Sequence, residues 1–118
     1  MRYAHPGTEG AIVSFKSKYG NNIGGEFVAP VKGQYFTNLT PISGPPLCAI
    51  ARSTAEDLEL ALDTAHVARE KWGNASPAER ASLLNKIADR MESNLNLLAM
   101  VETLDNGKPI RETTAADV

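Results

Sequence analysis

A chain of 118 residues forms at most one ordinary domain, and its 12 basic and 14 acidic side chains give a net charge of −2. This near balance argues against nucleic acid and against an anionic membrane surface as partners. The composition, 42% hydrophobic and 22% charged, excludes a disordered chain, and the apolar runs are much shorter than the roughly 20 residues of a membrane-spanning helix.

The first 20 residues are the least regular part of the chain. Residues 1–20 contain Pro6 and three glycines without a sustained hydrophobic period, which predicts an extended arm with a short strand at residues 11–15. No apolar segment follows Met1, so no secretory signal is predicted and we expect a cytoplasmic protein.

Residues 21–51 have the pattern of a small antiparallel β-meander. Gly24 and Gly25 form a two-residue hairpin signal, because a type I′ turn needs positive φ at both central positions. Alternation over residues 34–39 and a short apolar run at residues 47–51 predict two further strands.

At residue 53 the hydrophobic period changes from two to about 3.6, which predicts a helix over residues 54–72. Ser53 and Glu56 have the spacing of a capping box, in which a hydroxyl and a carboxylate satisfy free N–H groups of the first turn. Gly73 is placed to end this helix.

A second helix is predicted over residues 77–106. Ser76 and Glu79 form another capping box, and Gly107 followed by Pro109 gives a strong stop signal. An unbroken helix of this length would be ~45 Å long at about 1.5 Å per residue. Residues 110–118 have the pattern of the start of a third helix.

The second predicted helix carries a stripe of large apolar side chains. The stripe comprises Leu84, Ile87, Met91, Leu95 and Leu98. The preceding meander is too short to cover a helix of this length, so we expect the stripe to be exposed, to self-associate or to be covered by a neighbour.

Few residues qualify as catalytic or metal-binding groups. Cys48 is the only cysteine and has no basic neighbour, so a buried structural thiol is favoured over a nucleophile. His5 and His66 have no partners at metal-ligand spacing. Gly24 and Gly25 are not part of a G-x-G-x-x-G dinucleotide loop.

Asp105 is the polar residue that most needs a partner. A carboxylate in the last turn of a helix opposes the helix dipole, so a positive or hydrogen-donating group must compensate it. Lys108, Arg111 and a bound cation are the candidates that the sequence offers.

Several short motifs, in this order, resemble the N-terminal region of NAD(P)-dependent aldehyde dehydrogenases over about residues 19–118. They are Ile23-Gly-Gly-Glu26, Pro41 with Gly44, Trp72-Gly73, Glu79-Arg80, Ile87-Ala-Asp-Arg90 and the run from Glu102 to Pro109. Residues 6–8 and 19–28 look most like bacterial acetaldehyde dehydrogenases.

The resemblance implies an α/β parent protein with a Rossmann-type cofactor-binding domain. Residues 21–118 would be the N-terminal part of that domain, a β-meander at residues 21–51 followed by long α-helices. In that family the region packs against a sheet that later sequence supplies.

The function that the resemblance implies is oxidation of a small aldehyde, with acetaldehyde as the first candidate, to the carboxylic acid by NAD. NADP is the alternative cofactor, and the parent would be a homo-oligomer, a dimer or a tetramer. The family's nucleophilic cysteine, its glutamate base and its cofactor loop would lie beyond Val118. No catalytic or cofactor-binding residue is therefore assigned in this chain, which we expect to be inactive alone.

Two minor roles are also implied by the resemblance. In several relatives a monovalent cation is held by an aspartate that matches Asp105 and by backbone that matches Asn38 and Leu39. This sequence has Asn and Leu where Thr-Val is common, which leaves the backbone as the coordinating group. Ala116 matches a position that borders the aldehyde channel in some relatives.

The alternative function is a non-enzymatic helical interaction module whose apolar stripe docks a partner. The third helical pattern stops at Val118 without a capping residue. This stop favours the front part of an enzyme, because a chain end usually closes its last helix in polar residues.

Overall fold

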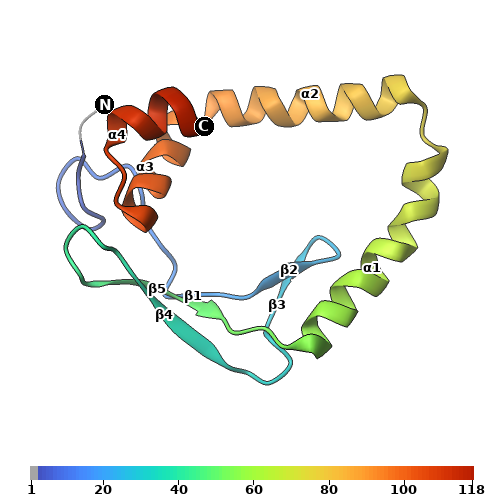
Figure 1. Cartoon of the computed structure of the whole chain (residues 1–118), viewed down its shortest axis with the longest axis horizontal. Helices are drawn as coiled ribbons and strands as arrows, with labels where there is room; N and C mark the ends of the chain where they lie inside the picture. Colours follow the sequence, from blue (N-terminus) through green and yellow to red (C-terminus); the bar gives the residue numbers. More distant parts are fainter. Residues whose placement is uncertain (1–2) are drawn as a thin grey trace.

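The computed structural model describes residues 3–118, which form five short strands followed by helices (Figure 1). The strands are β1 (Lys18–Tyr19), β2 (Asn21–Ile23), β3 (Glu26–Val28), β4 (Tyr35–Leu39) and β5 (Pro46–Ala51). The helices are α1 (Ala55–Asn74), α2 (Pro77–Ser93), α3 (Leu95–Asn106) and α4 (Ile110–Glu112), and a π-helical turn η1 (Thr113–Asp117) follows α4.

The strands form two sheets rather than one meander. β2 and β3 are a separate antiparallel hairpin, whereas β1, β5 and β4 form a three-stranded sheet in that order. β4 and β5 are antiparallel, as predicted, but β1 pairs with β5 in parallel. The prediction of a single antiparallel meander over residues 21–51 is therefore wrong, because β3 does not pair with β4.

The arm at residues 3–17 contains no strand, so the strand predicted at residues 11–15 is wrong. Val13 is 5% exposed and packs in the core with Met100 and Leu104, and Phe15 lies against the same cluster. The apolar residues of the arm therefore cover helix α3 instead of pairing in a sheet.

The turn between β2 and β3 has the geometry that its glycines predict. Gly24 and Gly25 have φ values of 65° and 87°, a region that other residues rarely adopt. The hairpin prediction is confirmed, and the register pairs Asn22 with Phe27.

Helix α1 begins one residue later than the predicted capping box implied, and it ends later than residue 72. Thr54 is the N-cap, and the Oδ2 atom of Asp57 accepts a hydrogen bond of 2.8 Å from the Thr54 backbone N–H. Ser53 instead donates to the side chain of Asn21. Gly73 lies inside the helix, because the chain leaves helical geometry only at Ala75, which is extended.

Helix α2 begins at the predicted capping box. The Ser76 hydroxyl accepts from the Glu79 backbone N–H at 3.2 Å, and the Glu79 carboxylate accepts from the Ser76 backbone N–H at 2.7 Å. Pro77 occupies the first helical position, where a missing N–H costs nothing.

Replacing Ser76 by alanine is expected to reduce the free energy of unfolding by about 1 kcal/mol, because one N–H of the first turn loses its acceptor. Denaturant unfolding of the wild-type chain and the variant measures this difference. Ser93→Ala is the control, since the Ser93 hydroxyl lies at the other end of α2, where it donates to the Arg90 carbonyl and accepts a long hydrogen bond of 3.4 Å from the Asn94 side chain. Equal losses in the two variants would contradict the capping role.

The single helix predicted over residues 77–106 is divided at Asn94. Asn94 has φ −115° and ψ 15°, and its side chain donates to the Arg90 carbonyl at 2.8 Å. Asparagine competes in this way with the helical backbone bonds. The prediction of one unbroken helix is therefore wrong, and α3 leaves the line of α2 and lies beside the arm (Figure 1).

The turn at Asn94 places α3 in the only core of the described residues. Val13, Met100 and Leu104 form its centre, and Tyr3, Phe15, Leu47, Val101 and Ile110 pack around them. Gly107 closes α3 with a left-handed φ of 81°, as predicted.

Helices α1 and α2 contribute no buried apolar side chain to this core. Leu84, Ile87 and Met91 are 59%, 49% and 49% exposed, which confirms the expected exposure of that part of the stripe. Leu95 and Leu98, beyond the turn, are half-buried. The two helices form an arch that extends away from the sheets (Figure 1).

The overall dimensions agree with this open arrangement. The radius of gyration is 17.4 Å, whereas a compact domain of this length has about 13.5 Å. No helix among residues 3–118 is both long and apolar enough to cross a membrane.

Candidate functional site

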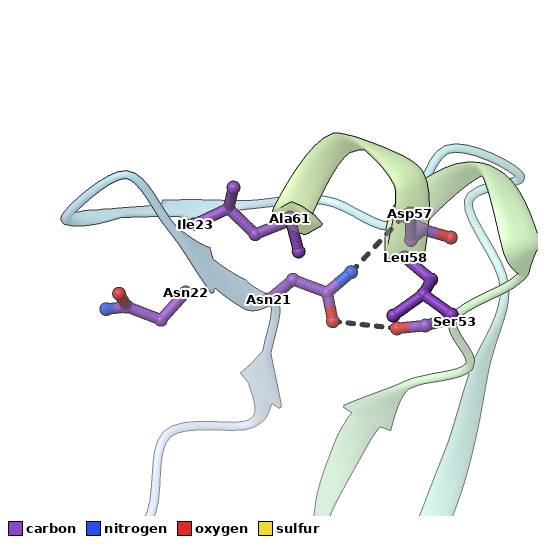
Figure 2. A pocket seen from close by; sticks show the side chains of 7 residues that line it. All are labelled: Asn21, Asn22, Ile23, Ser53, Asp57, Leu58 and Ala61. Carbon is purple, nitrogen blue, oxygen red and sulfur yellow. Dashed lines mark hydrogen bonds between the residues drawn. The ribbon is translucent and has the colours of Figure 1, made fainter. Parts of the chain in front are cut away.

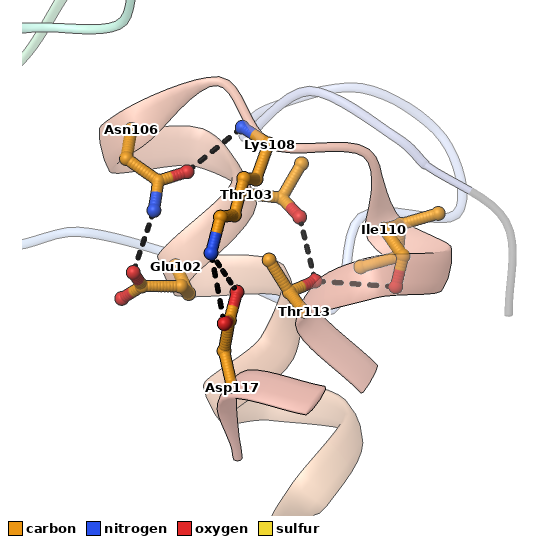
Figure 3. Close-up of polar contacts among 7 residues, drawn as sticks. All are labelled: Glu102, Thr103, Asn106, Lys108, Ile110, Thr113 and Asp117. Atoms are coloured by element: carbon orange, nitrogen blue, oxygen red, sulfur yellow. Dashed lines mark hydrogen bonds and ion pairs between the residues drawn. The ribbon is translucent and has the colours of Figure 1, made fainter. Parts of the chain in front are cut away.

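The C-terminal end of α3 holds a group of polar contacts with the residues that follow it (Figure 3). The Asn106 side chain donates to Glu102 at 2.6 Å and accepts from the Lys108 backbone N–H at 2.8 Å. The buried hydroxyls of Thr103 and Thr113 lie 2.9 Å apart and join α3 to η1. These bonds account for the polar residues on either side of Gly107, where α3 ends.

Lys108 and Arg111, two of the three candidate partners of Asp105, pair with other carboxylates instead. The Lys108 ammonium contacts both carboxylate oxygens of Asp117 at 2.8 Å, and this bond raises the pKa of Lys108 (Figure 3). The Arg111 guanidinium lies 3.6 Å from Glu112. Each cation pairs with an acidic residue on the helical turns that follow α3.

Asp105 is instead bound by Asn38, which lies 67 residues earlier in the chain. The Asn38 side-chain N–H donates to Oδ1 of Asp105 at 2.6 Å. Asn38 belongs to β4 and pairs across the strands with Cys48 of β5. The structure thus brings together two of the three residues predicted for the cation site, while Leu39 is 53% exposed at the end of β4.

The Asn38 side chain is not a cation ligand in the observed orientation. A cation is coordinated by oxygen lone pairs, whereas Asn38 directs an N–H group at the carboxylate. Residues 3–118 also contain no group of three or more His, Cys, Asp and Glu side chains that could hold a metal. The cation role of Asn38, Leu39 and Asp105 stays a prediction.

Cys48 is buried, as predicted, and its thiol is held in the protonated form. Burial raises the pKa of Cys48, and the negative charge of Asp105 raises it further. A nucleophilic cysteine needs the opposite environment, one that lowers the thiol pKa. The buried environment beside a negative charge favours a structural role for Cys48.

The remaining candidate residues lie apart from this group. His66 is exposed on α1, and His5 places Nδ1 2.9 Å from the Pro6 carbonyl oxygen in the arm. Ala116 is exposed on η1, and its role beside an aldehyde channel stays a prediction.

A second polar centre, at Asp57, was not among the sequence-based candidates (Figure 2). Asp57 is 2% exposed, and its Oδ1 accepts from the Asn21 side chain at 3.2 Å and from the Val31 backbone N–H at 2.8 Å. Its Oδ2 accepts from the backbone and hydroxyl of Thr54. The only sequence signal for this centre was an acidic residue in the first turn of α1.

Neither polar centre has the composition of a catalytic site. The Asp57 carboxylate is fully engaged in holding β2, the segment after β3 and the start of α1 together. The sequence also contains no G-x-G-x-x-G loop that would hold a dinucleotide. The apolar side chains that α1 and α2 leave exposed indicate that these helices pack against further protein.

Comparison with known proteins identifies that class. The model of the aldehyde dehydrogenase family matches residues 27–118. The chain is 64% identical over 117 residues to an EPTC-inducible aldehyde dehydrogenase of Rhodococcus erythropolis and 61% identical over 118 residues to an acetaldehyde dehydrogenase of Pseudomonas aeruginosa. These alignments cover 99% and 100% of this chain and 23% of each relative.

A solved structure shows the same fold. An indole-3-acetaldehyde dehydrogenase in complex with NAD+ matches with a TM-score of 0.83 and 32% sequence identity, over 87% of this chain and 21% of that chain. This chain belongs to the aldehyde dehydrogenase family. It spans about 23% of the length of the curated relatives that it matches.

Proposed function

We propose that this chain is the N-terminal part of the cofactor-binding domain of an NAD-dependent aldehyde dehydrogenase. The complete protein would convert an aldehyde, water and NAD+ to a carboxylate, NADH and two protons. The catalytic and cofactor-binding groups would come from the rest of the protein, and this chain would supply scaffold.

The observation that carries the proposal is the uncovered apolar surface of α1 and α2. Large apolar side chains on both helices are about half exposed or more, including Leu58, Val67, Leu84, Ile87 and Met91. Repeated large apolar side chains left exposed along two helices mark faces that another part of a protein covers. A sheet of the same cofactor-binding domain is the covering that the family membership supports.

We further propose acetaldehyde or another small aldehyde as the substrate, and NAD rather than NADP as the cofactor. The P. aeruginosa relative supports the substrate, and the NAD+ complex of the structural relative supports the cofactor. A cytoplasmic homo-oligomer, a dimer or tetramer, completes the proposal, and light scattering of the complete protein tests its size.

The test compares the purified 118-residue chain with the complete protein that contains it. We expect the complete protein to form NADH with a series of aldehydes, fastest with the short ones, and the chain alone to form none. The chain alone should also bind a hydrophobic dye strongly, because the faces of α1 and α2 are uncovered.

Three outcomes of the assay and the dye measurement would contradict the proposal. Aldehyde-dependent NADH formation by the chain alone, abolished in Cys48→Ser, would overturn the scaffold role. A monodisperse chain that binds no dye would contradict the need for a covering sheet. A complete protein that oxidises no aldehyde would refute the enzymatic assignment.

A further inference from the structure

We propose that Asn106 is a site of spontaneous deamidation, that the folded end of α3 restrains the reaction, and that its products open this helix end. The modification is chemical rather than enzymatic, and its reagent is water. The bonds around residues 102–108 carry the inference, so the assays of aldehyde oxidation do not test it.

The sequence singles out Asn106, because it is the one asparagine of the chain that a glycine follows. Glycine has no Cβ atom to hinder its backbone nitrogen, and asparagine is among the residues least stable to heat. Asn106 is also exposed, so water reaches it. Residues 106 and 107 therefore have the composition and the accessibility of a deamidation site.

The reaction begins when the backbone nitrogen of Gly107 attacks Cγ of Asn106. A bond forms between these two atoms, the bond from Cγ to Nδ2 breaks, and the side-chain nitrogen leaves as ammonia with the proton that the Gly107 N–H gives up. Water then adds to one of the two carbonyl carbons of the cyclic imide. The product is aspartate or isoaspartate, and one water is consumed for each ammonia released.

The first restraint acts on the attacking nitrogen. The Gly107 N–H donates to the Thr103 carbonyl at 2.9 Å, a backbone hydrogen bond at the end of α3. Asn106 is the last helical residue, and closing the imide ring requires rotation about its Cα–C bond, out of helical geometry. The attack must therefore wait until the last turn opens, and helix ends open more readily than helix centres.

The second restraint acts on the side chain that is attacked (Figure 3). Nδ2 of Asn106 donates to Oε1 of Glu102 at 2.6 Å, and its Oδ1 accepts from the Lys108 backbone N–H at 2.8 Å. A carboxylate only accepts and a backbone N–H only donates, so one orientation of the amide satisfies both partners. The side chain is thus held on both sides of the carbon that must move toward Gly107.

Deamidation would reverse these contacts. A carboxylate at residue 106 would face the carboxylate of Glu102, and it would lie at the end of α3, where the helix dipole disfavours a negative charge. Isoaspartate would also lengthen the backbone by one carbon just before Gly107. The contacts that join this helix end to η1, made by Thr103 and Lys108, would weaken as a result.

The test follows deamidation of the complete protein that contains this chain, in mildly alkaline buffer with and without guanidinium chloride. Trypsin releases residues 91–111 as one peptide, since proline follows Lys108, and mass spectrometry locates the exchange of NH₂ for OH. Asn94 and Asn96, each followed by leucine, are controls within the same peptide.

We expect Asn106 to react much faster than Asn94 and Asn96 in the denatured protein. In the folded protein its reaction should be about tenfold or more slower than in the denatured one. Either of two results would overturn the proposal without any variant. One is a denatured protein in which Asn106 reacts no faster than the two controls, and the other is equal rates in the folded and denatured protein.

Glu102→Ala and Glu102→Gln form a matched pair that tests the side-chain restraint. Both remove the charge, but glutamine keeps an oxygen that accepts from Nδ2 of Asn106. In the folded protein we expect several-fold faster deamidation for the alanine variant and a rate close to the wild type for the glutamine variant. Equal rates for the two variants would refute the restraint assigned to Glu102.

Asn106→Asp imitates one product of the reaction and tests its consequence. We expect faster amide hydrogen exchange at residues 102–113 of the complete protein than in the wild type, because the helix end opens more often. Asn85→Asp is the control, since it adds the same charge at an exposed position in the middle of α2. Exchange at the end of α3 that is equal in the two variants would contradict the proposed opening.

Discussion

Replacing Leu104 by alanine is expected to lower the free energy of unfolding by about 2–5 kcal/mol. Leu104 is fully buried and packs with Val13 and Met100 at the centre of the small core. Truncation leaves a cavity between the arm and α3, and the few other buried residues give little means of refilling it. Urea unfolding of the chain, followed by circular dichroism, measures the loss.

Leu84→Ala is the matched control, because Leu84 lies on α2 and is 59% exposed. In the isolated chain this change should stay within about 0.5 kcal/mol of the wild type. In the complete protein it should become costly if a sheet covers α2 as proposed. Equal losses for the two leucines in the isolated chain would contradict the described position of the core.

Replacing Asp57 by asparagine is expected to lower the Tm of the chain by roughly 5 °C or more. Each carboxylate oxygen of Asp57 accepts two hydrogen bonds, from Asn21 and Val31 on one side and from Thr54 on the other. An amide keeps only one oxygen, so in either orientation its NH₂ group faces donors. The hydrogen bonds of Asp57 that hold β2, the segment after β3 and the start of α1 together would be weakened.

The effect of Asp57→Asn should depend on pH with a definite sign. The backbone N–H groups of Thr54 and Val31 lower the pKa of the Asp57 carboxyl below its ordinary value of 3.8. A lowered pKa in the folded state stabilises the fold above the unfolded pKa, and this stabilisation is lost as the pH falls through the folded value. The Tm difference between wild type and variant should therefore be full near neutral pH and disappear in strong acid.

Glu56→Gln provides the control for Asp57. Glu56 is the neighbouring exposed carboxylate and makes only a surface ion pair of 3.5 Å with Lys32, which contributes little to stability. Its removal should change the Tm slightly at any pH. A Tm difference for Asp57→Asn that persists unchanged below its folded pKa would contradict the hydrogen-bonded role of the carboxylate.

The turns and helix ends that neighbouring residues determine could be predicted from the sequence. The Gly24-Gly25 turn, the Ser76–Glu79 capping box and the Gly107 stop each depend on residues within one turn of each other. The start of α1 could not be placed in the same way. Two capping boxes one residue apart are equally plausible there, and the bonds of Asp57 to Asn21 and Val31 decide between them.

In the candidate site, too, the contact that the sequence did not predict joins residues far apart in the chain. Asn38 and Asp105 were both named, through a family resemblance, but the direct bond between them was not expected. Proximity in sequence favoured Lys108 and Arg111 as partners of Asp105, whereas the folded chain supplies Asn38 from a strand. The parallel pairing of β1 with β5 and the break at Asn94 escaped prediction because tertiary contacts and one side-chain bond determine them.

The distance along the chain between Asn38 and Asp105 has a consequence for the timing of folding. The two residues are 67 positions apart, so at about 5–20 residues per second Asn38 is synthesised roughly 3–13 s before its partner. The antiparallel pair of β4 and β5 is local and forms in far less time. During synthesis this strand pair therefore exists for seconds before α3 is made and Asp105 can accept the hydrogen bond from Asn38.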